Sequence, residues 1–64
     1  MDTHVVAFWN HERSDILERF YFRLAQAGPT PYRTESAKRY ARQAEILRGV
    51  LAAIDSRLLR LAMV

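Results

Sequence analysis

Residues 37–61 read AKRYARQAEILRGVLAAIDSRLLRL and carry an apolar seam without a break. Steps of three and four from Ala37 select eight positions, none of them charged. These positions are Ala37, Tyr40, Ala44, Leu47, Leu51, Ile54, Leu58 and Leu61. Side chains at this spacing share one face of a helix, and such a face packs against another helix. The pattern predicts a long amphipathic helix over about residues 35–62, broadened on its apolar side by Ile46, Val50 and Ala53.

A second helix is predicted over about residues 3–27. Its apolar stripe is made of Val6, Trp9, Ile16, Phe20, Leu24 and Ala27. Arg13 interrupts this stripe, and an arginine tolerates such a position when its stem lies along apolar surface and its head reaches water or a carboxylate. That carboxylate could belong to another chain. The stripe is the face expected to meet the helix at 35–62.

One short loop, residues 28–34, separates the two helices. Gly28 suits a left-handed residue just past a helix end, and neither Pro29 nor Pro31 can continue that helix. Thr34 is predicted to cap the second helix, with Thr30 as a competing start. A short loop makes its helices antiparallel neighbours. The predicted fold is all-α: a two-helix antiparallel hairpin forming a single domain over residues 1–64.

A lone hairpin of this size is expected to be marginally stable. Ordering 64 residues opposes folding by about 96 kcal/mol, and burial of ~3,700 Å² of apolar surface returns about 93 kcal/mol. No cysteine is present to brace the fold. A second face of the first helix, predicted to lie roughly opposite its apolar stripe, also carries Phe8 and Phe22. We therefore predict that two hairpins dimerise into a four-helix bundle.

The sequence offers no catalytic or cofactor signature. His4 and His11 stand two turns apart on a helix, about 10 Å along its axis, which is too far to share one zinc ion. No histidine is well placed to activate a serine, and no glycine-rich turn could hold an oxyanion or a phosphate. We expect a protein that is not an enzyme, with no metal or cofactor. Since no segment reads as a signal peptide or a membrane span, a cytoplasmic location without membrane contact is expected.

Basic residues concentrate in the second half of the chain. Residues 1–27 carry three arginines against four carboxylates, whereas residues 28–64 carry seven cationic side chains against three carboxylates. Lys38, Arg39 and Arg42 lie beside Ile46 on the second helix. Arginine next to an aliphatic side chain is common in protein interfaces, so this patch is expected to meet an acidic protein surface. A purely solvated face and a nucleic-acid contact are the alternatives.

Taken together, these patterns predict a homodimeric protein-interaction module that acts as an adaptor, a chaperone subunit or an inhibitor of a regulator. In length and hairpin layout the chain resembles the Rop-like plasmid copy-number regulators, hairpin dimers that bind paired RNA loops, and small helical partners in secretion-chaperone complexes. The first resemblance implies the alternative function, an RNA- or DNA-binding regulator. The predicted partner-binding residues are Phe8, Phe22, Lys38, Arg39, Arg42 and Ile46. The predicted dimer or core seam comprises Trp9, Ile16, Phe20, Leu24, Tyr40, Leu47, Leu51, Ile54, Leu58 and Leu61.

Overall fold

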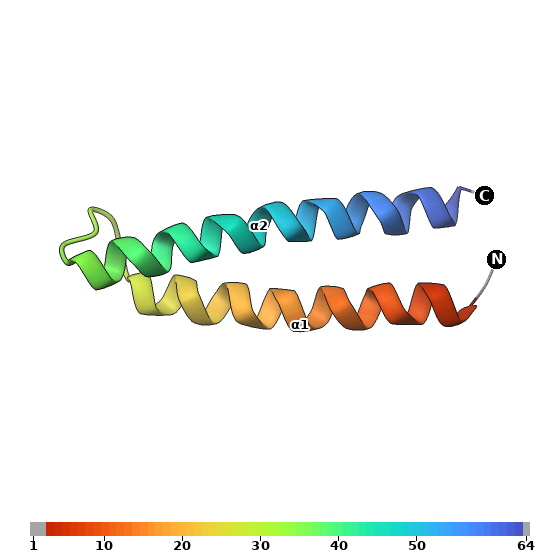
Figure 1. Cartoon of the computed structure of the whole chain (residues 1–64), viewed down its shortest axis with the longest axis horizontal. Coiled ribbons are helices and arrows are strands. Elements are labelled where there is room, and N and C mark those ends of the chain that lie inside the picture. Colours follow the sequence, from red (N-terminus) through yellow and green to blue (C-terminus); the bar gives the residue numbers. More distant parts are fainter. Residues whose placement is uncertain (1–2, 64) are drawn as a thin grey trace.

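Two long helices form an antiparallel hairpin in a computed structural model that describes residues 3–63. Helix α1 spans Thr3–Ala27 and helix α2 spans Glu35–Ala62, and they pack side by side along their whole length (Figure 1). These bounds coincide with the ranges expected from the sequence. The hairpin is 47 Å long, and the first turn of α1 lies beside the last turn of α2, at the end opposite the loop. The predicted all-α hairpin is confirmed.

The loop between the helices follows from a few residues. Gly28 has a φ of +73°, which a residue with a Cβ rarely adopts, and its N–H donates to the carbonyl of Leu24 at 3.2 Å. Pro29 then prevents the helix from continuing. Helix α2 starts at Thr34, whose Oγ1 accepts a hydrogen bond from the N–H of Ala37 at 3.0 Å. The competing start at Thr30 is therefore wrong.

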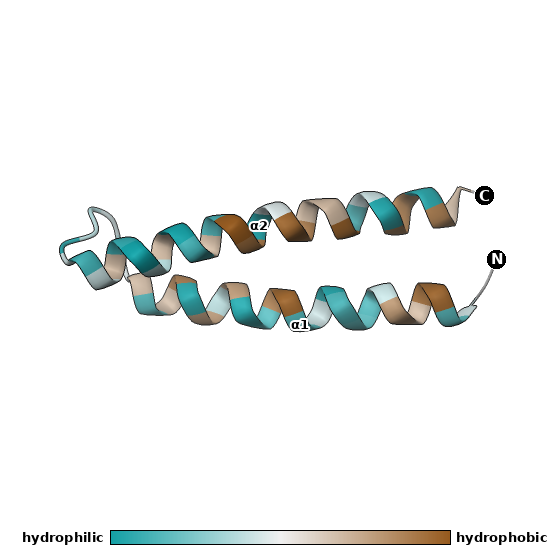
Figure 2. Ribbon diagram, in the orientation of Figure 1, coloured by the Kyte–Doolittle hydropathy of each residue, from teal (hydrophilic) through white to brown (hydrophobic). Residues whose placement is uncertain are grey.

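The α2 seam lies against α1 as predicted. All eight of its residues are buried or half-buried, and Ala44, Leu51 and Ile54 are the most enclosed. Hydrophilic residues alternate with these apolar ones along both helices (Figure 2). Because the seam of α2 is apolar at each position, it forms one continuous wall of the core.

The α1 seam differs from the prediction at one position. Leu24 remains 41% exposed, whereas Arg23 is half-buried and faces α2. The observed seam keeps the alternation of three and four residues from beginning to end: Val6, Trp9, Arg13, Ile16, Phe20, Arg23 and Ala27. After Phe20 this alternation selects residue 23, so Leu24 turns to the side. The placement of Leu24 in the core of a single hairpin was wrong. The predicted stripe took a step of four residues after Phe20, whereas the seam continues with a step of three residues to Arg23.

Two arginines in the α1 seam each reach a polar group on α2. Arg13 Nε lies 2.6 Å from Asp55 Oδ1, and Arg23 Nε donates to Gln43 Oε1 at 3.1 Å. The carboxylate that Arg13 uses thus belongs to its own chain and not to a second one. One contact lies near the middle of the hairpin and the other toward the loop, and a shift of one helix along the other would break both contacts.

Gly49 lies in α2 on the side away from α1. A Cβ added at this position would meet no atom within 4 Å outside the helix itself. A glycine is therefore not required at position 49 by a close contact between the two helices of one hairpin. In the part of the chain that the structure describes, neither helix combines the length and apolarity that a membrane crossing requires.

Candidate interaction surfaces

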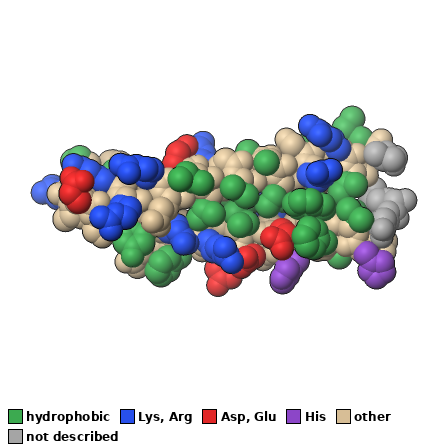
Figure 3. Space-filling view, viewed as in Figure 1, with side chains coloured by type: hydrophobic (Ala, Val, Ile, Leu, Met, Phe, Trp, Pro, Cys, Tyr) green, Lys and Arg blue, Asp and Glu red, His purple; other side chains and the backbone are tan. Residues whose placement is uncertain are grey.

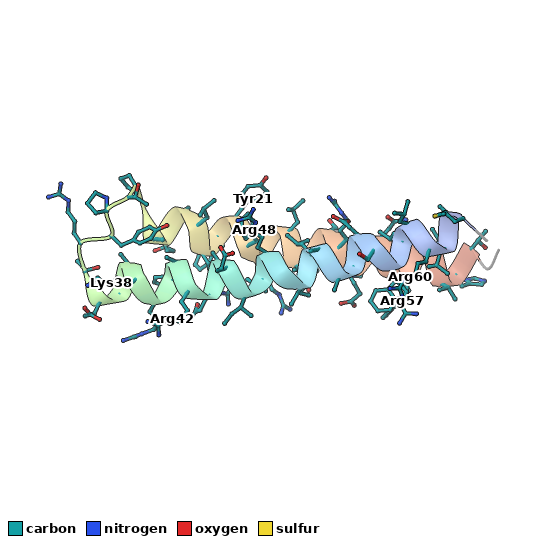
Figure 4. The ribbon with its side chains drawn as sticks, turned by 90° about the horizontal axis from the view of Figure 1, so that it is seen from above. Tyr21, Lys38, Arg42, Arg48, Arg57 and Arg60 are labelled. Carbon is teal, nitrogen blue, oxygen red and sulfur yellow. The ribbon has the colours of Figure 1, made fainter. Side chains whose placement is uncertain are left out.

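The seam divides the hairpin surface into two long flanks. Helical spacing assigns Phe8, Glu12, Asp15, Arg19, Phe22, Ile46, Val50, Ala53, Arg57 and Arg60 to one side, which we call the groove flank. The other side, which we call the Tyr21 flank, carries Leu17, Tyr21, Leu24, Arg48 and Leu59. Seen from above, Tyr21 and Arg48 project on one side of the hairpin, whereas Arg57 and Arg60 project on the other (Figure 4).

A shallow groove of about 320 Å³ runs between the helices on the groove flank. Its lining comprises Trp9, Glu12, Ile16, Val50, Ala53, Ile54 and Arg57. The guanidinium of Arg57 lies over the ring of Trp9, 5.4 Å from the ring centroid, in the range of a cation–π contact. Hydrophobic side chains gather along this face, with charged side chains above and below them (Figure 3). The groove is therefore an apolar strip with Glu12 on its α1 side and Arg57 on its α2 side.

Phe8 and Phe22 are both more than half exposed, but neither lies opposite the seam. Phe8 packs edge-to-face on Trp9, with ring centroids 5.1 Å apart. Phe22 packs edge-to-face on Tyr40 of α2, with ring centroids 6.5 Å apart. The expectation that these two residues occupy the far side of α1 is thus corrected: they stand at the edge of the core, on the groove flank. At this edge each ring has one face against the hairpin and much of its surface in water.

The predicted basic patch is exposed near the loop end of α2. Lys38 Nζ pairs with Glu35 Oε1 at 3.2 Å, so part of its charge is balanced within the helix. Among residues 3–63, Arg39 and Arg42 have no ion pair, and Ile46 beside them is 64% exposed. The structure brings these four residues together on α2, with Phe22 nearby on α1. Phe8 lies toward the other end of the hairpin, so the predicted partner-binding residues extend along its length.

The Tyr21 flank contains exposed apolar residues that the site prediction lacked. Tyr21 is 59% and Leu59 is 62% exposed, and Leu24 lies on the same side. A spacing of four and three residues joins Leu17, Tyr21 and Leu24, so the sequence held the signal for this strip. It was missed because Leu24 was assigned to the seam.

The described residues offer little for chemistry. No group of three His, Cys, Asp or Glu side chains within residues 3–63 is arranged to hold a metal ion. A second hollow of about 230 Å³ lies by the loop and is lined by Ala27, Pro29, Pro31, Arg33, Thr34 and Ala37. Its single ionisable side chain is Arg33, which provides no general base or nucleophile.

Comparison of the chain with protein families, with curated proteins and with solved structures found no match.

Proposed function

We propose that this protein is a non-enzymatic protein-interaction module that works as a homodimer. The observation that carries the proposal is the amount of apolar side chain left exposed by one hairpin. Among residues 3–63, eight large hydrophobic residues are exposed: Phe8, Tyr21, Phe22, Leu24, Ile46, Val50, Leu59 and Met63. Extended apolar patches are rare on monomeric soluble proteins and mark interaction sites. Both flanks carry such residues, so the exposed apolar surface is more than one dimer contact alone would cover.

The total surface of the chain supports the same proposal. A compact monomer of 7.5 kDa is expected to expose about 4,250 Å². The hairpin exposes 5,103 Å², an excess of about 850 Å². A standard protein interface buries about 800 Å² on each partner. The excess reflects the elongated shape of the hairpin, and it is comparable to what one chain contributes to one interface of ordinary size.

The chemistry of the exposed residues favours an acidic protein surface as the target. Arg39 and Arg42 are unpaired among the described residues and stand beside the exposed Ile46. Arginine is one of the residue types enriched at the positions that dominate binding energy. In this proposal the protein acts in the cytoplasm as an adaptor, a chaperone subunit or an inhibitor of its target.

The test is capture of partners from the source cell followed by titration with each purified partner. The Arg39→Ala/Arg42→Ala double variant should weaken binding of the true target by about tenfold or more. Arg48→Ala, which removes a similar charge from the Tyr21 flank, is the matched control and should bind like the parent protein. Equal binding by all three proteins would refute the role of the basic patch.

A nucleic-acid-binding regulator is the second candidate. It is favoured by four arginines, Arg39, Arg42, Arg57 and Arg60, that helical spacing places on one side of α2, where Figure 4 shows the last three. If they contact phosphates, the logarithm of duplex affinity should fall with the logarithm of salt concentration, with a slope of about −0.9 for each phosphate contacted. Weak binding that does not change between low and moderate salt would exclude this candidate.

A further inference from the structure

The groove flank of α1 has a pattern that nearly repeats when the helix is reversed. Phe8 and Phe22 lie seven residues on either side of Asp15. Glu12 lies three residues before Asp15, and Arg19 lies four residues after it. The two positions are therefore symmetric about Asp15 to within one residue, or 1.5 Å along the helix axis. In an antiparallel pair of α1 helices centred here, each Phe8 meets a Phe22. Each Glu12 then meets an Arg19 of opposite charge.

The groove flank of α2 has a matching pattern centred on Ala53. Ile46 lies seven residues before Ala53, and Arg60 lies seven residues after it. Val50 lies three residues before Ala53, and Arg57 lies four residues after it. In an antiparallel pair of α2 helices, the stem of each arginine would lie along an aliphatic side chain. Alanine at the centre, having the smallest side chain with a Cβ, lets two helices approach closely.

The two centres lie at the same height in the hairpin. Ile16, next to Asp15, and Ala53 line the same groove, and the contact of Arg13 with Asp55 joins the helices at this level. A single two-fold axis perpendicular to both helices can therefore pass through both centres. Two independent patterns that share one axis are what a self-complementary face requires, since in a two-fold dimer each residue pair occurs twice.

We propose that the groove flank binds the groove flank of a second copy of this chain, with the two hairpins antiparallel and their loops at opposite ends. This inference rests on the proposed homodimer and assigns its face and register. The dimer covers Phe8, Phe22, Ile46 and Val50 and closes the groove beside Trp9. Asp15 lies on the axis opposite its own copy, and its carboxylate is already held by Arg19 Nη2 of the same chain at 3.1 Å. Each Arg19 then lies between Asp15 of its own chain and Glu12 of the partner chain.

The Tyr21 flank fits a second copy less well. Its α1 strip is apolar at Leu17, Tyr21 and Leu24 but small or polar at Asn10 and Ser14, so its apolar half is confined to the loop end. This flank is therefore not the dimer face. In the register centred on Ala53 the partner's α2 ends at the height of Ala44, so Arg39 and Arg42 lie beyond it and stay accessible to the target.

Charge reversal of the full-length chain tests the register. Glu12→Arg and Arg19→Glu each replace two attractive pairs by two repulsive ones. Each variant should dissociate about tenfold more readily than the parent dimer in sedimentation equilibrium. In a heterodimer of the two variants, the substituted position 12 of one chain faces the substituted position 19 of the other, and their charges are opposite. The unchanged Arg19 of the first chain likewise faces the unchanged Glu12 of the second. The mixture should therefore regain nearly the parent affinity as a heterodimer, and the Glu12→Arg/Arg19→Glu double variant should regain it as a homodimer.

Controls separate this inference from the proposed function. Glu18→Arg makes the same charge change on the outer side of α1 and should leave the dimer unchanged, and circular dichroism checks that every variant is helical. If neither charge reversal changes the dissociation constant of the dimer, or if the mixture dimerises no more tightly than either variant alone, the proposed face is wrong. The proposed homodimer would stand in both cases. A parent chain that stays a helical monomer at all concentrations would overturn the homodimer itself.

Discussion

The two helices contribute unequally to the core that they share. The seam of α2 is apolar at each position, and three of its residues are buried. The seam of α1 contains Arg13 and Arg23, and its only buried residue is Ala27 at the last turn. Apolar burial by α2 supplies free energy that does not depend strongly on exact alignment, because hydrophobic attraction is non-directional. The arginines of α1 add contacts that form in one alignment, so α2 supplies affinity and α1 supplies register.

The largest expected effect is a charge in the α2 seam. Leu51→Asp buries a carboxylate in the middle of the core, where the two seam arginines, Arg13 and Arg23, already bind Asp55 and Gln43. It should cost more than about 4 kcal/mol and unfold the chain. Ala52→Asp introduces the same group one residue away at an exposed position and should remain helical. Thermal melting followed by circular dichroism compares the two. A cooperative helical transition for Leu51→Asp would mean that this seam is not the core.

A pair of phenylalanines in α1 tests which of its faces is core. Phe20→Ala should cost about 3 kcal/mol, at the lower end for this change because the ring is only half-buried. Phe22→Ala should cost much less at low protein concentration, since more than half of its side chain is exposed. Its cost should increase with concentration as dimers form. Equal losses at all concentrations would show that both rings are core. Trp9→Ala is expected to behave like Phe20→Ala.

The start of α2 provides a smaller and separate test. Thr34→Ala removes the acceptor of the Ala37 N–H and should lower the free energy of unfolding by about 1 kcal/mol. Thr30→Ala deletes the same hydroxyl within the loop and should change stability by less than about 0.5 kcal/mol. Chemical denaturation curves of both variants decide the matter. A larger loss from Thr30→Ala would place the functional cap at the other threonine.

The smallest expected effect is the coupling of Arg13 to Asp55. Their side chains are 41% and 53% exposed, so solvent screens the pair, and a double-mutant cycle should give about 0.2 to 1 kcal/mol. The coupling should decrease as salt is added. A measured coupling that is zero at low salt would remove Arg13 from the residues that fix the register.

These tests also mark how far the sequence alone could lead. The helix ranges, the loop and the α2 seam were predictable because Gly28, the prolines and an unbroken apolar period are local signals. The α1 seam was predicted except at Leu24, because the helix places Arg23 there, and a rule that assigns apolar residues to the inside selects the leucine. The contact of Phe22 with Tyr40 was not predictable either, since it depends on how far α1 is rotated about its own axis. The exposed Ile46, Arg39 and Arg42 were foreseen from the width of the α2 apolar face and from charge, whereas the Tyr21 flank became visible once Leu24 was placed.

The loop also disfavours the exchange of helices between two chains. Hairpins with flexible connections can open into one continuous helix and exchange halves with a second chain, which keeps the same core contacts. Here Gly28 turns the chain out of the helix at a φ of +73°, and Pro29 and Pro31 cannot be absorbed into a continuous helix without a kink. Domain exchange is thereby disfavoured. Each chain forms its core from its own two helices, so subunits of the proposed dimer would separate and recombine without exchanging helices.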